Sequence, residues 1–323
     1  MSVEPVIEKW QGRVLEVKVG ATKEQGGTRS AQITLGGQAC LPFLKQEGQM
    51  PNPPVIAFEV WDSVPADWPA PLAASFSDVF NDPAAWARKC VTAYGARAIC
   101  LRLQGAHPDC GNMSIDAEAK ILSAVLKAVS VPVILKGCGE DEKDNALLPA
   151  LSEAAKGERL LIGSAVQDNY KTLTGAALAD GHAIIAESPI DVNIAKQLNI
   201  LITDMGLSAD RIVIDPTIGA MGYGLEYAYS IMERCRLSAL SGDKMLALPF
   251  IGFVGQETWR VKEVQSAEGE FPGFGSVQER GVAWETVTAA ALLQAGCDLL
   301  VMRDPKAVAQ TQKYIDNLMG VKK

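Results

Sequence analysis

The chain has 323 residues, of which 48% are hydrophobic and 21% charged, and its formal net charge at pH 7 is −8. This acidic balance argues against a nucleic-acid-binding protein, because such proteins present a basic face, and no apolar run is long enough to predict a transmembrane helix. The first residues, MSVEPVIEKWQG, lack the basic start and apolar core of a signal peptide, so we expect a cytoplasmic protein without a membrane partner.

The first 50 residues differ in pattern from the rest of the chain. Residues 14–19 and 32–35 alternate between apolar and polar side chains, as β-strands do. The segment between them, GATKEQGGTRS, is polar and contains glycine, which is typical of a turn. We therefore expect an N-terminal β-hairpin that caps one end of the following domain.

From residue 55 onwards, short apolar runs alternate with segments of helical pattern. The candidate strands lie at residues 55–60, 98–103, 132–135, 159–162, 183–186, 212–214, 246–252 and 298–302. The candidate helices lie at residues 83–95, 115–129, 142–156, 168–179, 189–205, 225–241, 281–295 and 304–319. Three helix starts are expected where a polar cap precedes proline, at Asp82-Pro83, Ser188-Pro189 and Asp304-Pro305.

Eight strands, each followed by a helix, predict an α/β fold: a (β/α)₈ TIM barrel with an N-terminal β-hairpin extension. The domain division is residues 1–50 for the extension and residues 51–323 for the barrel. A doubly wound open sheet is the alternative, since a miscounted unit would change the fold. Residues 255–280 contain several glycines and are expected to form an extended insertion after the seventh strand.

Ligands of such barrels contact the loops that follow the strands. These positions are polar and net acidic: Glu59, Asp62, Gln104, His107, Lys136, Cys138, Ser164, Asp168, Asn169, Glu187, Asp191, Asn193, Asp215, Thr217, Glu257, Arg303 and Asp304. Asp191, Asn193 and Asp215 are candidates to hydrogen-bond the amidine edge of a pterin ring. Asp191 equally suits the first turn of a helix, where a carboxylate interacts favourably with the helix dipole.

The most informative stretch is RIVIDPTIGAMGYGLEYAYSIMER, residues 211–234. Pro216 ends the sixth strand because it has no N–H to donate. Gly219, Gly222 and Gly224 then leave the backbone accessible before the next helix begins. Such a loop suits a large, flat ligand or a protein that approaches closely, and a simple tight turn is the alternative.

Other motifs for metal or catalytic sites are missing from the sequence. The seven cysteines form no C-x-x-C pair or compact cluster, so we expect buried thiols and neither a metal cluster nor disulfides. His107 and His182 are too few for a three-histidine zinc site, and His182 is expected to be structural. The residues alone therefore predict a ligand-ready loop face without a convincing catalytic group.

Four separated stretches together resemble one family. They are GATKEQGGTR (20–29), SPIDVNIAKQLNILI (188–202), IDPTIGAMGYGLEYAYSIMER (214–234) and EFPGFG (270–275). They are similar to the small subunit of the corrinoid iron–sulfur protein, the delta-type subunit of acetyl-CoA decarbonylase/synthase. That protein is the methyl carrier of the acetyl-CoA (Wood–Ljungdahl) pathway, and the similarity runs over nearly the whole chain.

The resemblance implies a heterodimer whose large subunit carries a [4Fe–4S] cluster and a cobamide-binding domain, while loops of this chain cover one side of the shared cobamide. It also implies three further partners: the methyltetrahydrofolate methyltransferase, acetyl-CoA synthase/CO dehydrogenase and a reductive activator. This subunit then supplies shape and shielding, with no catalytic residue and no metal ligand of its own. The residues expected to face the corrinoid are Thr217, Gly219, Gly222, Tyr223 and Gly224.

Two enzyme classes remain as alternatives. A pterin-dependent corrinoid methyltransferase, acting on methyltetrahydrofolate or tetrahydrosarcinapterin, would hold its pterin with Asp191, Asn193 and Asp215. An unrelated barrel enzyme such as an aldolase would need a nucleophile, for which Lys136 at the end of the third strand is the candidate.

Overall fold

Eight parallel strands form the centre of the computed structural model, which describes residues 6–321. The strands are β3 (Val55–Trp61), β4 (Ala98–Arg102), β5 (Val133–Lys136), β6 (Leu161–Ala165), β7 (Ala183–Glu187), β8 (Ile212–Asp215), β9 (Ile251–Gly252) and β10 (Leu299–Met302). They pair in the order β8-β7-β6-β5-β4-β3-β10-β9, and a parallel bridge from Ile214 to Phe250 joins the two ends of this order. The predicted TIM barrel is confirmed, and the open-sheet alternative is wrong.

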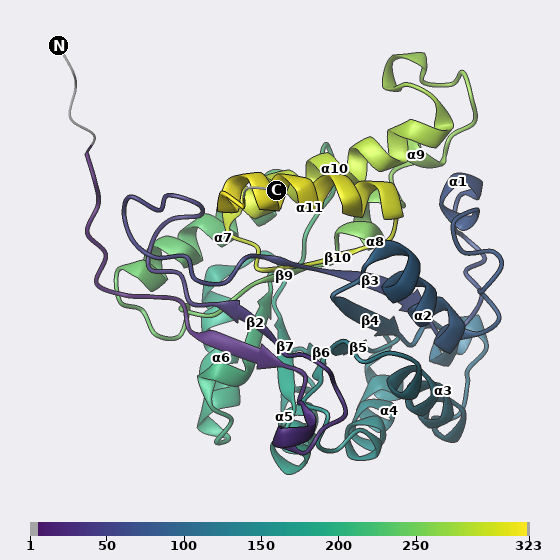
Figure 1. Cartoon of the computed structure of the whole chain (residues 1–323). Helices are drawn as coiled ribbons and strands as arrows, with labels where there is room; N and C mark the ends of the chain where they lie inside the picture. The colour runs from purple at the N-terminus through teal and green to yellow at the C-terminus, as the bar shows by residue number, and fades with distance from the viewer. Residues whose placement is uncertain (1–5, 322–323) are drawn as a thin grey trace.

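Helices follow the strands and surround them (Figure 1). The long helices are α2 (Pro83–Tyr94), α3 (Ile115–Ala128), α4 (Asp141–Ala154), α5 (Tyr170–Asp180), α6 (Val192–Asp204), α7 (Leu225–Leu240), α10 (Val277–Ala295) and α11 (Pro305–Met319). The short ones are α1 (Ala70–Ala73), α8 (Val254–Thr258) and α9 (Lys262–Gln265). All eight predicted helices are present, and their ends differ from the predicted ones by a few residues.

The start of α6 differs from the prediction. Ser188-Pro189 was expected to begin this helix, but the N-cap is Asp191, whose carboxylate accepts from the N–H groups of Asn193 and Ile194 at 2.7 and 3.1 Å. Ser188 instead continues the sheet, because its N–H donates to the Asp215 carbonyl oxygen at 2.9 Å. The predicted caps Asp82 and Asp304 are confirmed.

The segment 255–280 is not simply extended, as the sequence suggested. It contains most of α8, all of α9 and a 3₁₀ turn at Pro272–Phe274, and it projects from the edge of the barrel at the upper right of Figure 1. Helices of four or five residues are too short to show a clear apolar period, so the sequence pattern misses them.

The N-terminal hairpin consists of β1 (Glu16–Val19) and β2 (Ile33–Gly36), which pair antiparallel as predicted. Its apolar face packs against side chains at the amino ends of the barrel strands (purple in Figure 1). The buried cluster that they share includes Val17, Val19, Ile33, Leu35, Val55, Ala98, Leu161, Ala183 and Leu299. The hairpin therefore closes this end of the barrel, while the domain boundary after residue 50 stays a prediction.

Arg29 fastens the hairpin loop to the barrel. The residue is 2% exposed, and its Nε donates to Glu158 at 2.9 Å. Its Nη atoms donate to the carbonyl oxygens of Val129 and Leu126, both at 2.6 Å. A buried guanidinium is tolerated only when it is paired and hydrogen-bonded in this way.

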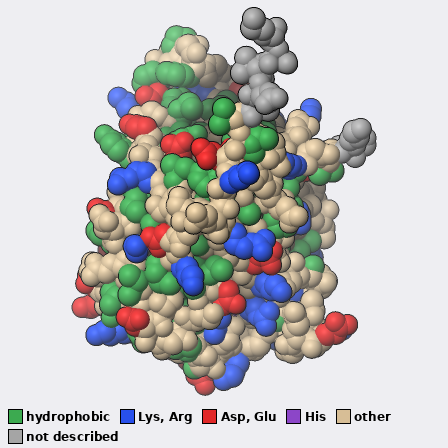
Figure 2. Space-filling view, turned by 90° about the vertical axis from the view of Figure 1, so that its left-hand side faces the viewer, with side chains coloured by type: hydrophobic (Ala, Val, Ile, Leu, Met, Phe, Trp, Pro, Cys, Tyr) green, Lys and Arg blue, Asp and Glu red, His purple; other side chains and the backbone are tan. Residues whose placement is uncertain are grey.

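The side of the molecule shown in Figure 2 carries acidic, basic and apolar side chains that are intermingled. This pattern differs from the basic stripe of a nucleic-acid-binding surface. Within residues 6–321, no helix has the length and apolar character needed to cross a membrane.

We expect Arg29→Met to lower the free energy of unfolding by about 3–5 kcal/mol, because it leaves the Glu158 carboxylate buried without its cation. Urea unfolding followed by circular dichroism measures the change. Arg97→Met alters an exposed arginine just before β4 and serves as the control, with an expected effect below about 0.5 kcal/mol. Equal stability of the two variants would contradict a structural role for Arg29.

Candidate functional site

The carboxyl ends of the barrel strands meet in a polar mouth. Six charged side chains from different strand ends lie in it: Glu59, Arg102, Lys136, Glu187, Asp215 and Arg303. Three are cations and three are carboxylates. These six strand-end charges therefore balance, whereas the sequence predicted a net acidic face. That prediction left out Arg102 and counted loop and cap residues such as Asp191, which caps α6.

One wall of the mouth is built around an ion pair between Glu59 and Arg303. The Arg303 Nε and Nη2 atoms donate to the two Glu59 carboxylate oxygens at 2.9 and 3.0 Å. Trp61 Nε1 donates to the same carboxylate at 2.8 Å, and the Arg303 guanidinium lies 5.3 Å from the Trp61 ring centroid. Burial by itself would raise the pKa of Glu59, but the Arg303 guanidinium outweighs it and holds that pKa below its ordinary value.

Helix α10 fixes the backbone of this wall through Glu285. Its Oε1 accepts from the Arg303 N–H at 2.6 Å, and its Oε2 accepts from Asp304 N–H at 3.1 Å and from Trp259 Nε1 at 2.8 Å. Burial raises the pKa of Glu285 to about 8. Trp61 and Trp259 are both buried in this wall.

The opposite wall contains Lys136, Glu187 and Asp215, which line a hollow of about 170 Å³ that we call the carboxylate hollow. Lys136 Nζ donates to Glu187 Oε2 at 2.8 Å and also to the Ser164 hydroxyl. Asp215 Oδ1 accepts from the Thr217 N–H at 3.0 Å. Burial, and then the nearby Glu187 charge, raises the pKa of Asp215 to about 7. This wall can therefore hold or release a proton near neutral pH.

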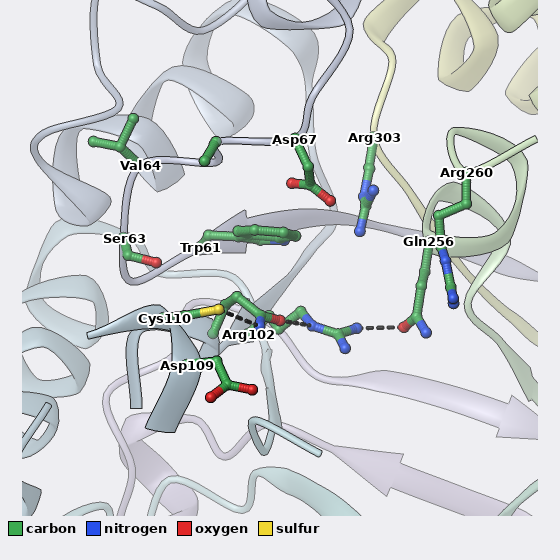
Figure 3. Close-up of a pocket in the computed structure, with 12 residues that line it drawn as sticks. Trp61, Ser63, Val64, Asp67, Arg102, Asp109, Cys110, Gln256, Arg260 and Arg303 are labelled. Carbon is green, nitrogen blue, oxygen red and sulfur yellow. Dashed lines mark hydrogen bonds between the residues drawn. The ribbon is translucent and has the colours of Figure 1, made fainter. Parts of the chain in front are cut away.

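A second hollow of about 470 Å³ lies between the loop after β3, the 3₁₀ turns after β4, and α8 (Figure 3). Arg102, Arg260 and Arg303 line it, and we call it the arginine hollow. Arg102 donates to the Gln256 side chain, and these two residues line both hollows. Their contact separates the two parts of the mouth.

The glycine loop is placed partly inside and partly outside this mouth. Thr217, with a φ of 52°, lines the carboxylate hollow. Gly219 packs within its own loop, since a Cβ there would lie 2.3 Å from the Tyr223 carbonyl oxygen. Gly219 is thus required by the turn itself, and Thr217 is the predicted residue nearest the carboxylates.

The other three predicted residues lie on the outer side of the loop. Gly222 has a φ of 78° and open space around an added Cβ, and Gly224 is the N-cap of α7. Tyr223 is 49% exposed and its hydroxyl donates to Glu263 of α9 at 2.6 Å. The loop is therefore tied to the insertion, and corrinoid contact by these residues stays a prediction.

Several other sequence candidates have structural roles or lie outside the mouth. Asp191 caps α6 and Asn193 is exposed, so Asp215 is the member of the predicted pterin set that lies in the mouth. His182 is fully buried; its Nδ1 accepts from the Leu160 N–H at 3.1 Å, and its Nε2 lies 2.9 Å from the Ser152 carbonyl oxygen. The His182 prediction is confirmed. Of the seven cysteines, Cys110 alone is exposed.

Sequence reasoning missed Arg102, Gln256 and Arg260. A signal existed for Arg102, because a single arginine near the end of the apolar strand AICLRL is unusual unless it reaches a polar end of the barrel. Gln256 and Arg260 lie in and just after α8, which the sequence had not placed.

The fold and this mouth define a (β/α)₈-barrel protein whose strand ends form a polar, charged mouth. Dihydropteroate synthases share the fold: the Stenotrophomonas maltophilia structure has a TM-score of 0.56 at 15% identity and covers 85% of this chain and 96% of that one. The Coxiella burnetii structure has a TM-score of 0.55 at 11% identity, with the same coverage of 85% and 96%.

The sequence comparisons identify the family. Residues 16–310 match the family model of the CO dehydrogenase/acetyl-CoA synthase delta subunit. The chain is 38% identical to the acetyl-CoA decarbonylase/synthase complex subunit delta of Archaeoglobus fulgidus, covering 98% of this chain and 71% of that protein. With the subunit delta of Methanocaldococcus jannaschii it shares 35% identity over 99% of this chain and 77% of that protein. The chain belongs to the delta-subunit family, which confirms the resemblance.

The Asp215 carboxyl predicts a specific pH dependence of stability. Its pKa in the folded protein, about 7, exceeds the ordinary aspartate value of 3.8, so its contribution to stability is present at low pH and is lost as the pH rises towards 7 and beyond. We expect Asp215→Asn to match the wild type at pH 4 and to be more stable at pH 8, by on the order of 2 kcal/mol.

Denaturant unfolding at several pH values measures this difference. Asp191→Asn is the matched control, because asparagine also caps a helix and should leave the pH dependence unchanged. An Asp215→Asn variant that follows the wild type at every pH would show that the buried carboxyl does not titrate in this range.

Proposed function

We propose that this chain is the barrel subunit of a heterodimeric corrinoid iron–sulfur methyl carrier. A larger partner subunit carries the [4Fe–4S] cluster and the cobamide domain, and the mouth of this barrel covers one side of the cobamide. The cobamide supplies the methyl-carrying chemistry between methyltetrahydrofolate, with its separate methyltransferase, and acetyl-CoA synthase/CO dehydrogenase. The observation that carries the proposal is membership of the delta-subunit family over residues 16–310.

The size of the mouth supports a covering role. The larger hollow measures about 470 Å³, which is in the range of sites for drug-sized ligands, and a cobamide is considerably larger than such ligands. A cobamide would therefore lie across the rim, with its other side on a second protein. The open backbone at Gly222, where an added Cβ meets no atom within 4 Å, supports close approach of a flat molecule.

In this role the residues of the chain bind and shield, and they carry no group transfer themselves. Thr217 and Ile218 at the carboxylate hollow, and Tyr223 further out, form the side of the rim that faces a covering molecule. The bond from Tyr223 to Glu263 keeps this side fixed to α9. A reductive activator acts on the assembled carrier.

The proposal is tested by anaerobic purification of the chain alone and with its large subunit, followed by measurement of cobalt content and the corrinoid absorption spectrum. We expect a colourless isolated chain and a pair that holds cobamide more firmly than the large subunit alone. Equal retention with and without this chain would contradict the covering role.

A bulky side chain at position 222 should weaken the retention of cobamide by the assembled pair. We expect Gly222→Phe to lower the cobalt content of the gel-filtered pair by about tenfold, equivalent to about 1.4 kcal/mol, because the aromatic ring fills the space left for the corrinoid. Gly222→Asn is the control, since asparagine tolerates the left-handed backbone and adds little bulk. Equal retention by the two variants would place the corrinoid away from this loop.

A pterin-dependent corrinoid methyltransferase is the second candidate. The observation that favours it is the carboxylate hollow, where Asp215, with its pKa of about 7, lies near Glu187 and Lys136. Carboxyl groups of this kind hydrogen-bond the N–H groups of a heterocycle or transfer a proton to it. Methyltetrahydrofolate binding by the isolated chain, lost in Asp215→Asn and kept in Asp191→Asn, would support the enzyme, and its absence would favour the covering role.

A further inference from the structure

We infer that the arginine hollow binds the anionic group, a carboxylate or a phosphate, of a small molecule. The hollow encloses about 470 Å³ and is lined by Arg102, Arg260 and Arg303 together with Trp61 and Gln256. This volume lies within the usual range for small-molecule sites, about 300–1,000 Å³. An anion in this position is bound by this chain alone, whether or not a corrinoid covers the mouth.

The first argument is an imbalance of buried charge. Arg303 is 4% exposed, and it donates to both oxygens of the Glu59 carboxylate, at 2.9 and 3.0 Å. Arg102 reaches the same carboxylate at 3.8 Å, and its closer partners are the neutral side chains of Gln104 and Gln256. Two guanidinium groups thus share one carboxylate. Buried charge without a counter-charge is costly, and an anion in the hollow removes that cost.

The neighbouring carboxylates do not correct this imbalance. Two carboxylates, Asp67 and Asp109, line the arginine hollow itself. Both are exposed, the Asp109 side chain by 90%, so water screens their charges. In the carboxylate hollow, Glu187 is paired with Lys136 at 2.8 Å, and Glu257 is paired with Arg260 at 3.4 Å. Asp215 is partly protonated near neutral pH, because burial raises its pKa to about 7. The spare positive charge therefore remains beside Arg102.

The second argument is the direction of the guanidinium groups. Figure 3 shows the ends of Arg102 and Arg303 directed towards the space on one side of Gln256, with Arg260 on the other side of that residue. Within the described part of the chain, Arg102 Nη2 and Arg303 Nη1 have no hydrogen-bond partner, although both residues line the hollow. A guanidinium presents its donors in a planar fork that matches carboxylate and phosphate oxygens.

Arg260 provides a third cation that can adjust to the ligand. Its side chain is 64% exposed, and its Nη1 lies 3.4 Å from Glu257, one turn back on the same segment. Such an exposed pair is weak, so the guanidinium is free to turn towards a bound anion. The hollow thus combines two fixed guanidinium groups with one adaptable group at its edge.

The test is isothermal titration of the full chain with inorganic phosphate and with succinate, in buffer of low ionic strength. We expect at least one probe to bind with a dissociation constant of about 1 mM or below. Arg102→Gln should weaken that binding by about tenfold or more, and Arg260→Gln by about threefold, because each removes charge-assisted hydrogen bonds. Arg97→Gln, at the opposite end of β4, is the matched control and should bind as the wild type does.

The preferred probe identifies the ligand: tighter phosphate binding indicates a phosphorylated molecule, and tighter succinate binding indicates a carboxylic acid. Failure of both probes to saturate the wild type by about 10 mM would overturn the inference. So would equal affinities of Arg102→Gln, Arg260→Gln and Arg97→Gln, since binding would then not involve the hollow. Arg260 is exposed, so its variant gives a result even where Arg102→Gln does not fold.

Discussion

The ligand end of the barrel depends on the buried ion pair between Glu59 and Arg303. It joins the ends of β3 and β10, the first and last strands of the barrel, which are neighbours in the sheet although the two residues lie 244 positions apart. A buried carboxylate that lost its guanidinium would be strongly unfavourable. The Arg303 guanidinium also lies over the rings of Trp61 and Trp68, and the Arg303 backbone N–H donates to Glu285 of α10. The wall of the mouth, the tryptophans packed against it and helix α10 are therefore all linked through Arg303.

Features that depend on local sequence patterns were predictable, and contacts between residues far apart in the sequence were not. Apolar runs between helical segments located all eight strands, because inward and outward faces of a barrel strand are both buried. The seventh run was predicted as 246–252, but the strand is only Ile251–Gly252, with a single bridge at Phe250, since burial of residues such as Leu248 does not require a sheet partner. The position of Arg102 depends on Gln256, 154 residues away, and no local pattern contains that contact.

The two hollows give the mouth a character that a purely space-filling subunit would not need. Burying Lys136, Glu187, Asp215 and Arg102 costs solvation free energy, and apolar side chains of similar size would pack as well. Their charges are unevenly divided by the Arg102–Gln256 contact: carboxylates outnumber Lys136 in the carboxylate hollow, and arginines outnumber the exposed Asp67 and Asp109 in the arginine hollow. Covering a cofactor and recognising a small anion are compatible tasks, because the rim serves the first and the interior serves the second.

The closure of the amino end of the barrel has a consequence for the order of assembly during synthesis. The hairpin precedes the barrel strands in the chain, yet its partners lie much later in the sequence: Arg29 pairs with Glu158, and Gln38 bonds to Asp298 at 2.7 Å. Contacts of such long sequence separation form slowly. The hairpin, which is synthesised before the barrel strands, is thus among the last elements to be fixed, and until then Val55, Leu161 and Leu299 lack the apolar cover that it provides.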